Sequence, residues 1–384
     1  MRRSLLLALA ASATVLAGQA AASQYVYTSI PEPGYPVTGV AGLNDSGQVI
    51  VDYGNPSGQG SFIYQGGVQT QITPPLIPNG GNHVNASAAA INSSGTVVGT
   101  DIQTTNGVGN IFDFEGFVDH AGVYSFVSVP GAVDTQLTGI NNAGVVLGKY
   151  ETASSNGVFT YFTETGGNFT TIGSPGLSQV TAVGIDSAGD VVGNATYQNA
   201  RVGFIDSGGV YSLLSAPGSQ GSTSIQAVSE SGLIAGNFFA NGRDIGFIDD
   251  GGTFTDVQPQ NATITEITGI NDSGTVVGTA NHQSFVDADG TYTMLSLPGP
   301  GFDPNNNQGV NSINDAGLIG GSYYSGNGFN YQYTAFIASP ASETPPVPEP
   351  ATWSLLIGGF ALTGAALRRR RQASATATAT ATAA

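Results

Sequence analysis

The feature that most constrains this chain is a short pattern that the sequence repeats seven times. Each copy has a small residue, an aliphatic residue, a polar turn closed by glycine and a short aliphatic run, as in the stretch 269–278. Neighbouring turn glycines are 42 to 49 residues apart, and such a period is typical of propellers and other repeat architectures. We therefore predict one fold built from seven equivalent units. The turn glycines are Gly47, Gly95, Gly144, Gly189, Gly232, Gly274 and Gly317.

Each unit is predicted to hold four β-strands. Asn, Asp and Ser bond to their own backbone in a tight turn, and glycine accepts the positive φ that such a turn needs. In the fourth copy the strand-like segments are 181–186, 190–196, 202–206 and 210–216. Four short strands per unit of this length indicate a propeller blade. The third strand carries a recurrent phenylalanine, at Phe62, Phe117, Phe159, Phe204, Phe247, Phe285 and Phe336.

Small residues recur at two fixed positions around each turn. The residue five positions before the turn glycine is always Gly, Ala or Ser, and the residue four positions after it is Gly in every copy except the first, which has Val51. Small residues within strands mark a close approach of another chain segment. We expect strands that crowd around a central axis.

The last repeat lacks a fourth strand, because the chain runs into a proline-rich segment after its third strand at 334–337. The segment 25–30 resembles the fourth strands of the other copies. It would complete the last blade and remove the open edge. The expected fold is all-β: a seven-bladed β-propeller of four-stranded blades over residues 23–339, closed by its N-terminal strand.

Composition and the N-terminus indicate export. Arg2 and Arg3 precede an apolar run and a small-residue cleavage site near Ala22, which predicts a signal peptide at 1–22. The chain has no cysteine, which excludes a disulfide scaffold and cysteine-bound zinc. Between 24 and 339 only 3 basic residues face 24 acidic ones, so this part should repel nucleic acid and anionic lipid.

The C-terminal part is divided into a proline-rich linker at 340–346, a sorting segment at 347–371 and an Ala/Thr-rich tail at 372–384. The apolar run 351–367 has 17 residues, at the lower limit for a transmembrane helix. Pro348, Glu349 and Pro350 precede this run, and four arginines that would hold its end in the cytoplasm follow it. These four arginines are Arg368, Arg369, Arg370 and Arg371.

This C-terminal arrangement resembles the PEP-CTERM sorting signal. The resemblance implies recognition and processing by an exosortase, a transient membrane anchor, and delivery to the cell envelope or surface of a Gram-negative bacterium that makes exopolysaccharide. The repeats at 40–338 resemble the HAF family of extracellular repeat proteins, although Gly-Phe-Ile or Gly-Phe-Val stands where that family has His-Ala-Phe. The second resemblance implies no known activity.

The sequence offers few candidates for chemistry, and no nucleophile motif or phosphate-binding loop occurs. His83 and His282 are expected on the face with the long loops and His120 on the face with the short turns, so the first two could act as acid and base in a lyase. The stretch 287–290 has a calcium-loop start, but it aligns with the third-to-fourth strand turns and we interpret it as a hairpin.

Aromatic residues near the ends of the second strands form a candidate ligand rim. They could stack on sugar rings, or they could cap the blade cores, which we favour. We expect a non-enzymatic surface or matrix protein with no required cofactor, associated with exopolysaccharide. A polysaccharide lyase and a calcium-dependent carbohydrate-binding module are the alternatives. The rim residues are Tyr53, Tyr150, Tyr197, Phe238 and Tyr323.

Overall fold

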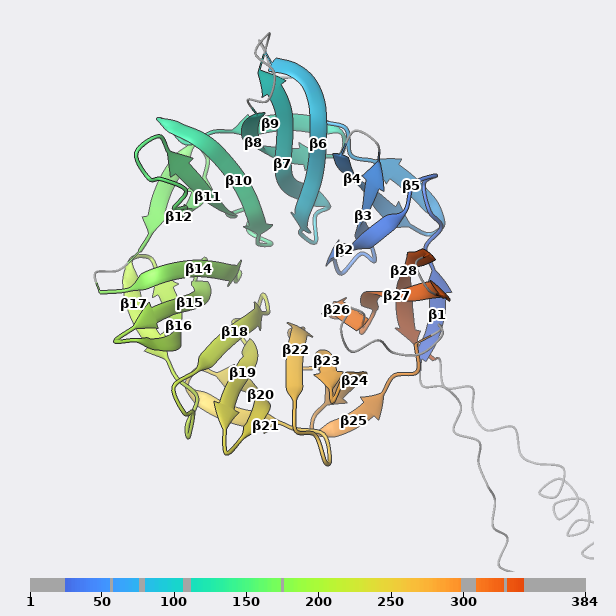
Figure 1. The fold of residues 1–384 in the computed structure, drawn as a ribbon, viewed down its shortest axis with the longest axis vertical. Coiled ribbons are helices and arrows are strands. Elements are labelled where there is room, and N and C mark those ends of the chain that lie inside the picture. Colours follow the sequence, from blue (N-terminus) through green and yellow to red (C-terminus); the bar gives the residue numbers. More distant parts are fainter. Residues whose placement is uncertain are drawn as a thin grey trace, which may run out of the picture. The chain divides into compact units, whose positions relative to one another are not determined.

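The computed structural model describes residues 25–341, apart from 56–57, 76–79, 106–111, 174–175, 298–308 and 328–329. The chain separates into two compact units, Met1–Pro340 and Ala341–Ala384. The described part of the first unit is all-β, and its strands radiate from a common centre (Figure 1). No helix in the described part is long and apolar enough to cross a membrane. The signal peptide at 1–22 and the apolar run at 351–367 lie outside the described residues.

Three sheets hold four consecutive strands each, and two eight-stranded sheets each join two such groups of four. Each group has one strand at each of four radial positions (Figure 1). The innermost strands are β2 (Val37–Leu43), β6 (Gly80–Ile91), β10 (Ala132–Ile140), β14 (Ser178–Ile185), β18 (Thr223–Val228), β22 (Thr265–Ile270) and β26 (Gly309–Ile313). The second strands are β3 (Val49–Asn55), β7 (Thr96–Thr105), β11 (Val146–Thr152), β15 (Val191–Tyr197), β19 (Ile234–Ala240), β23 (Val276–Ala280) and β27 (Ile319–Asn327). The third strands are β4 (Gly58–Gln65), β8 (Phe112–His120), β12 (Thr160–Thr165), β16 (Ala200–Ser207), β20 (Arg243–Asp250), β24 (Gln283–Ala288) and β28 (Asn330–Pro340). The outer strands are β5 (Val68–Gln71), β9 (Val123–Val127), β13 (Asn168–Ile172), β17 (Val210–Leu214), β21 (Thr253–Val257), β25 (Thr291–Met294) and β1 (Tyr25–Ser29).

The N-terminal strand lies where the sequence placed it. β1 pairs antiparallel with β28, from Tyr25 opposite Pro340 to Ser29 opposite Phe336. It therefore occupies the fourth position of the group that begins with β26. Because Pro340 belongs to this strand pair, the linker begins after it rather than at it.

The turns between the first and second strands have the predicted geometry. All of the turn glycines in the repeated pattern have positive φ, from 74° to 91°. The stretch 287–290 is the predicted hairpin turn, because Asp289 and Gly290 have φ of 51° and 77° between β24 and β25. The interpretation of the polar repeat as a hairpin is confirmed.

Each group is packed around one fully buried phenylalanine of its third strand, with one correction to the sequence analysis. In the third repeat the buried residue is Phe162, not Phe159. Phe159 precedes β12, and its ring lies 4.6 Å from the ammonium group of Lys149. Phe162 lies opposite Gly148, the position that the other copies also use. The buried rings are Phe62, Phe117, Phe162, Phe204, Phe247, Phe285 and Phe336.

The two sets of small residues have different causes. The glycine of the second strand lies tightly between both neighbouring strands, since a Cβ on Gly193 would lie 2.7 Å from the ring of Phe204 and closer still to the backbone oxygen of Thr181. The small residue of the first strand instead faces the next repeat, since a Cβ on Gly184 would lie 2.8 Å from the Cγ1 atom of Val228. The second-strand glycines thus reflect the predicted close approach of a neighbouring strand, and at Gly184 the crowding comes from the next repeat.

Candidate functional site

The repeats are joined near the axis by the asparagine that opens the polar turn. Five asparagines donate a side-chain N–H to the backbone carbonyl of the same turn in the next repeat. The last of these bonds joins the seventh repeat to the first, from Asn314 Nδ2 to Asn44 O at 2.9 Å. The other four run from Asn44 to Asn92 O, from Asn92 to Asn141 O, from Asn141 to Asp186 O and from Asn271 to Asn314 O, at 2.6 to 3.1 Å.

The same side chain also closes its own turn. Asn271 Oδ1 accepts the N–H of Thr275 at 2.9 Å, and the other four asparagines accept equivalent bonds. An amide is needed for both tasks, because it has an acceptor on one side and donors on the other. Asp186 and Ser229 occupy this position in the fourth and fifth repeats, where they accept the turn N–H of Asp190 and Leu233. Neither can donate as an amide does, so the link between these repeats must differ.

Glu230 supplies part of that different link. Its carboxylate accepts the N–H of Asn142 at 3.1 Å and the hydroxyl of Ser187, so it reaches two repeats. Its own carbonyl accepts the N–H of Ser187 at 3.1 Å. Burial raises the pKa of Glu230 although these bonds favour its charged form.

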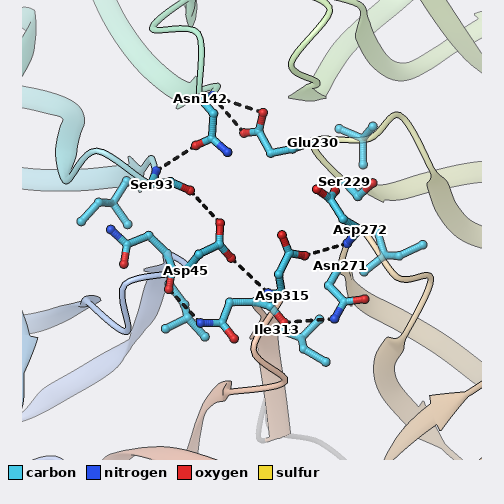
Figure 2. Close-up of a pocket in the computed structure, with 15 residues that line it drawn as sticks. Asp45, Ser93, Asn142, Ser229, Glu230, Asn271, Asp272, Ile313 and Asp315 are labelled. Atoms are coloured by element: carbon cyan, nitrogen blue, oxygen red, sulfur yellow. Dashed lines mark hydrogen bonds between the residues drawn. The ribbon is translucent and has the colours of Figure 1, made fainter.

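A pocket of about 160 Å³ lies where these turns meet. Figure 2 shows its lining residues arranged in a ring, with the side chains of Asp45, Asp315 and Glu230 among those that face the centre. Asp45 accepts the N–H of Asp315 at 3.0 Å and the hydroxyl of Ser93 at 2.6 Å. Asp315 in turn accepts the N–H of Asp272 at 2.9 Å. Four carboxylates thus line the pocket, those of Asp45, Glu230, Asp272 and Asp315.

The chemistry available at this pocket is limited by these bonds. Burial raises the pKa of Asp315, and the neighbouring carboxylates of Asp45 and Asp272 raise it further. No Lys, Arg or His lines the pocket. Within the described residues, no three acidic or imidazole groups are placed to hold a metal ion. The carboxylates therefore serve mainly as acceptors for backbone N–H groups of other turns around the axis.

The axial ring of carboxylates is not predicted from the sequence, where turn formation alone explains the polar residues of these units. A signal was present, because an acidic residue follows the turn position in the first, fifth, sixth and seventh repeats. Only the structure brings these four positions to one pocket.

The predicted aromatic rim is placed mainly against the blade cores. Four of its members contact the buried phenylalanine of the neighbouring strand, with ring centroids 6.0 to 6.3 Å apart. Phe238 is buried, and Tyr197 is half-buried at the end of β15. These contacts favour the capping interpretation over a row of free stacking platforms. The four contacting residues are Tyr53, Tyr150, Phe238 and Tyr323.

The candidate histidines occupy separate elements. His83 lies in β6 opposite Gln103, and its side chain falls outside what the structure describes. His282 lies in the turn between β23 and β24 with a φ of 71°. His120 ends β8, and its Nδ1 atom bonds to Thr96 Oγ1 at 2.9 Å.

The sorting residues Pro348, Glu349, Pro350 and Arg368 to Arg371 also lie outside the described residues, but a family comparison covers them. Residues 346–371 match the PEP-CTERM protein-sorting motif. This motif marks an exported protein of the bacterial cell envelope that an exosortase sorts. The sequence matches none of the curated proteins.

Solved structures similar to this chain are β-propellers. The β-propeller domain of the Trilobed protease from Pyrococcus furiosus has a TM-score of 0.53 and 9% identity, covering 83% of this chain and 99% of its own. An acylaminoacyl peptidase in complex with Z-Gly-Gly-Phe-chloromethyl ketone has a TM-score of 0.50 and 9% identity, covering 75% of this chain and 49% of its own. At such low identity the likeness shows the fold alone.

Proposed function

We propose that this PEP-CTERM protein is a non-enzymatic component of the surface or extracellular matrix of a Gram-negative bacterium, associated with exopolysaccharide. In this proposal the repeats form a seven-bladed propeller closed by β1. An exosortase removes the segment at 347–371, which serves as a membrane anchor until then. The main support for a non-enzymatic role is that the axial carboxylates already accept hydrogen bonds from the turns that they join.

The closed ring is supported at two radii. At the outer edge β1 completes the group of β26, β27 and β28 by pairing with Phe336 to Pro340. Near the axis the side chain of Asn314 bonds to the carbonyl of Asn44. The first and last repeats are thus in contact both at the outer edge and near the axis. β1 also covers the edge that β28 would otherwise expose to aggregation.

The non-enzymatic role is supported by how the axial acids are used. A general acid or base must reach a proton of the substrate. Both oxygens of Asp45 already accept bonds, from Asp315 and Ser93, and the carboxylate of Glu230 accepts bonds from Asn142 and Ser187. These groups stabilise the frame, so their removal should affect folding rather than a reaction.

The sorting part of the proposal is tested with two variants that carry a tag between 342 and 346. Glu349→Ala with Pro350→Ala leaves the apolar run 351–367 unchanged, so the anchor should still insert. Uncleaved protein should then accumulate in the inner membrane while the propeller outside stays folded. Wild-type cleavage of this double variant would refute the sorting role of these residues.

The matched variant changes Arg368 to Arg371 to Ser. It removes the positive charges that hold the end of the anchor in the cytoplasm, so part of the tail should cross the membrane. Protease protection of a C-terminal tag measures this. An unchanged topology would show that the arginines do not act as the membrane stop.

A further inference from the structure

A groove of about 560 Å³ opens between the first and second groups of strands, on the face of the short turns. One wall comes from β4, β5 and the turn at Gln48, and the other from the hairpin of β8 and β9 and the turn at Gly95. Its volume falls in the range of sites that hold small ligands, roughly 300 to 1,000 Å³. We propose that this groove binds a hexose unit of a neutral polysaccharide, which deepens and rests on the proposed association with exopolysaccharide.

Two polar side chains of the groove, those of Gln71 and His120, are each held in place by a hydrogen bond at one atom. Gln71 Oε1 accepts the hydroxyl of Tyr53 at 2.8 Å, and His120 Nδ1 bonds to Thr96 Oγ1 at 2.9 Å. The other polar atoms, Nε2 of Gln71 and Nε2 of His120, make no hydrogen bond within the described residues. Fixed side chains lose little freedom when a ligand binds, so these atoms are prepared to meet sugar hydroxyls.

The groove also has apolar surface next to these polar atoms. Ile63, Val68 and the ring of Tyr124 contribute to the lining, and Val68 is 64% exposed. The hydroxyl of Tyr124 accepts the N–H of Thr73 at 3.0 Å, which fixes the ring. A pyranose has apolar C–H faces and a polar rim, and an aromatic ring beside amides suits both.

The charges of the groove select a neutral sugar. No Lys or Arg lines it, and its one carboxylate, Asp119, accepts the N–H of Gly122 at 2.7 Å. An acidic sugar would meet this carboxylate with no cation to pair with. Amide and imidazole groups offer both donors and acceptors, which neutral hydroxyls require.

The fold itself does not require His120 or Gln71. His120 lies opposite Val123, as Ser207 lies opposite Val210, and Gln71 lies opposite Phe62, as Leu213 lies opposite Phe204. The equivalent groove of the fourth and fifth groups, about 390 Å³, is lined by Leu213 together with three carboxylates. The same strand positions thus accept Ser and Leu in the fourth repeat, and the groove of the fourth and fifth groups has Leu213 where the first groove has Gln71. The three carboxylates are those of Asp186, Asp190 and Asp249.

The test measures binding of the exported protein to maltohexaose, cellohexaose, mannohexaose and laminarihexaose by calorimetry. The variant is His120→Ser with Gln71→Leu, which installs the two residues that the fourth repeat already carries. Binding of at least one hexasaccharide is expected, and the variant should bind it about tenfold more weakly through the loss of two hydrogen bonds. Ser207→Ala is the matched control and should bind like the wild type.

The proposal is overturned if none of the four hexasaccharides binds, if the double variant binds like the wild type, or if only an alginate hexasaccharide or an unrelated peptide binds. Equal unfolding midpoints of variant and wild type confirm that the fold is intact. Cell fractionation of the wild type separates the two proposals. Surface location without binding would refute the groove alone, whereas loss of surface location would refute the proposed function.

Discussion

The asparagine of the polar turn carries two tasks at the scale of a single residue. Asn92 accepts the N–H of Thr96 within its own turn and donates to Asn141 O at 3.1 Å in the next. Asn92→Asp keeps the first bond and loses the second, and we expect it to lower the free energy of unfolding by about 1–3 kcal/mol. Asn168→Asp on the exposed outer hairpin is the control and should change little. Equal urea midpoints for both variants would show that the inter-repeat bond is unimportant.

A second prediction at this scale concerns a buried acid between the first two repeats. Asp52 accepts the hydroxyl of Ser61, whose oxygen accepts the N–H of Ala88 at 3.0 Å. Burial raises the pKa of Asp52 to about 6 from a usual value of 3.8. The folded state therefore binds a proton more tightly than the unfolded state, so this contribution to stability is complete below pH 3.8 and is lost as pH rises through about 6.

Asp52→Asn keeps an acceptor for Ser61 without the charge. It should be more stable than the wild type by about 1–3 kcal/mol at pH 8, and the difference should shrink toward pH 4. Urea unfolding at several pH values measures this. A difference that is constant with pH would show that Asp52 does not titrate in this range.

At the scale of strands, the glycine opposite the buried phenylalanine lets neighbouring strands approach closely in every copy except the first, which has Val51. A Cβ on Gly193 would lie 2.7 Å from the ring of Phe204 and closer still to the backbone oxygen of Thr181, whereas a Cβ on Gly139 would have its nearest contact at 3.4 Å, with Leu147 Cβ. Gly193→Ala should therefore cost about 1–3 kcal/mol, and Gly139→Ala should be close to neutral. Thermal unfolding compares them, and similar melting temperatures would contradict the packing derived for Phe204.

Most of the strand pattern could be predicted from the sequence, because turn chemistry and periodicity are local. The turn glycines and the hairpin at 287–290 needed only the residues beside them. The choice of Phe159 over Phe162 failed because the loop before β12 is longer than in most copies, and sequence spacing alone does not fix which ring faces Gly148. The close approach of another strand at the second-strand glycines could also be predicted, whereas the ring that lies opposite each of them depends on pairing across the sheet.

At the scale of the whole molecule, the repeats are not identical in the residues that link them near the axis. Asp186 and Ser229 interrupt the series of asparagines, and Glu230 bonds to two other repeats instead. The axial pocket and the groove at His120 both arise from residues in different repeats, which pairing and turn rules do not bring together. The strands and turns could therefore be predicted from the sequence better than either pocket.

The central claim is that β1 closes a ring of repeats. Deleting Tyr25–Ser29 would expose the edge of β28 and remove the pairing with Phe336 to Pro340. Calorimetric melting of this truncation is compared with that of a control protein that lacks residues 373–384 of the Ala/Thr-rich tail. We expect a much lower melting temperature and aggregation for the first truncation, and wild-type melting for the second. Equal melting temperatures for the two truncations would contradict closure by the N-terminal strand.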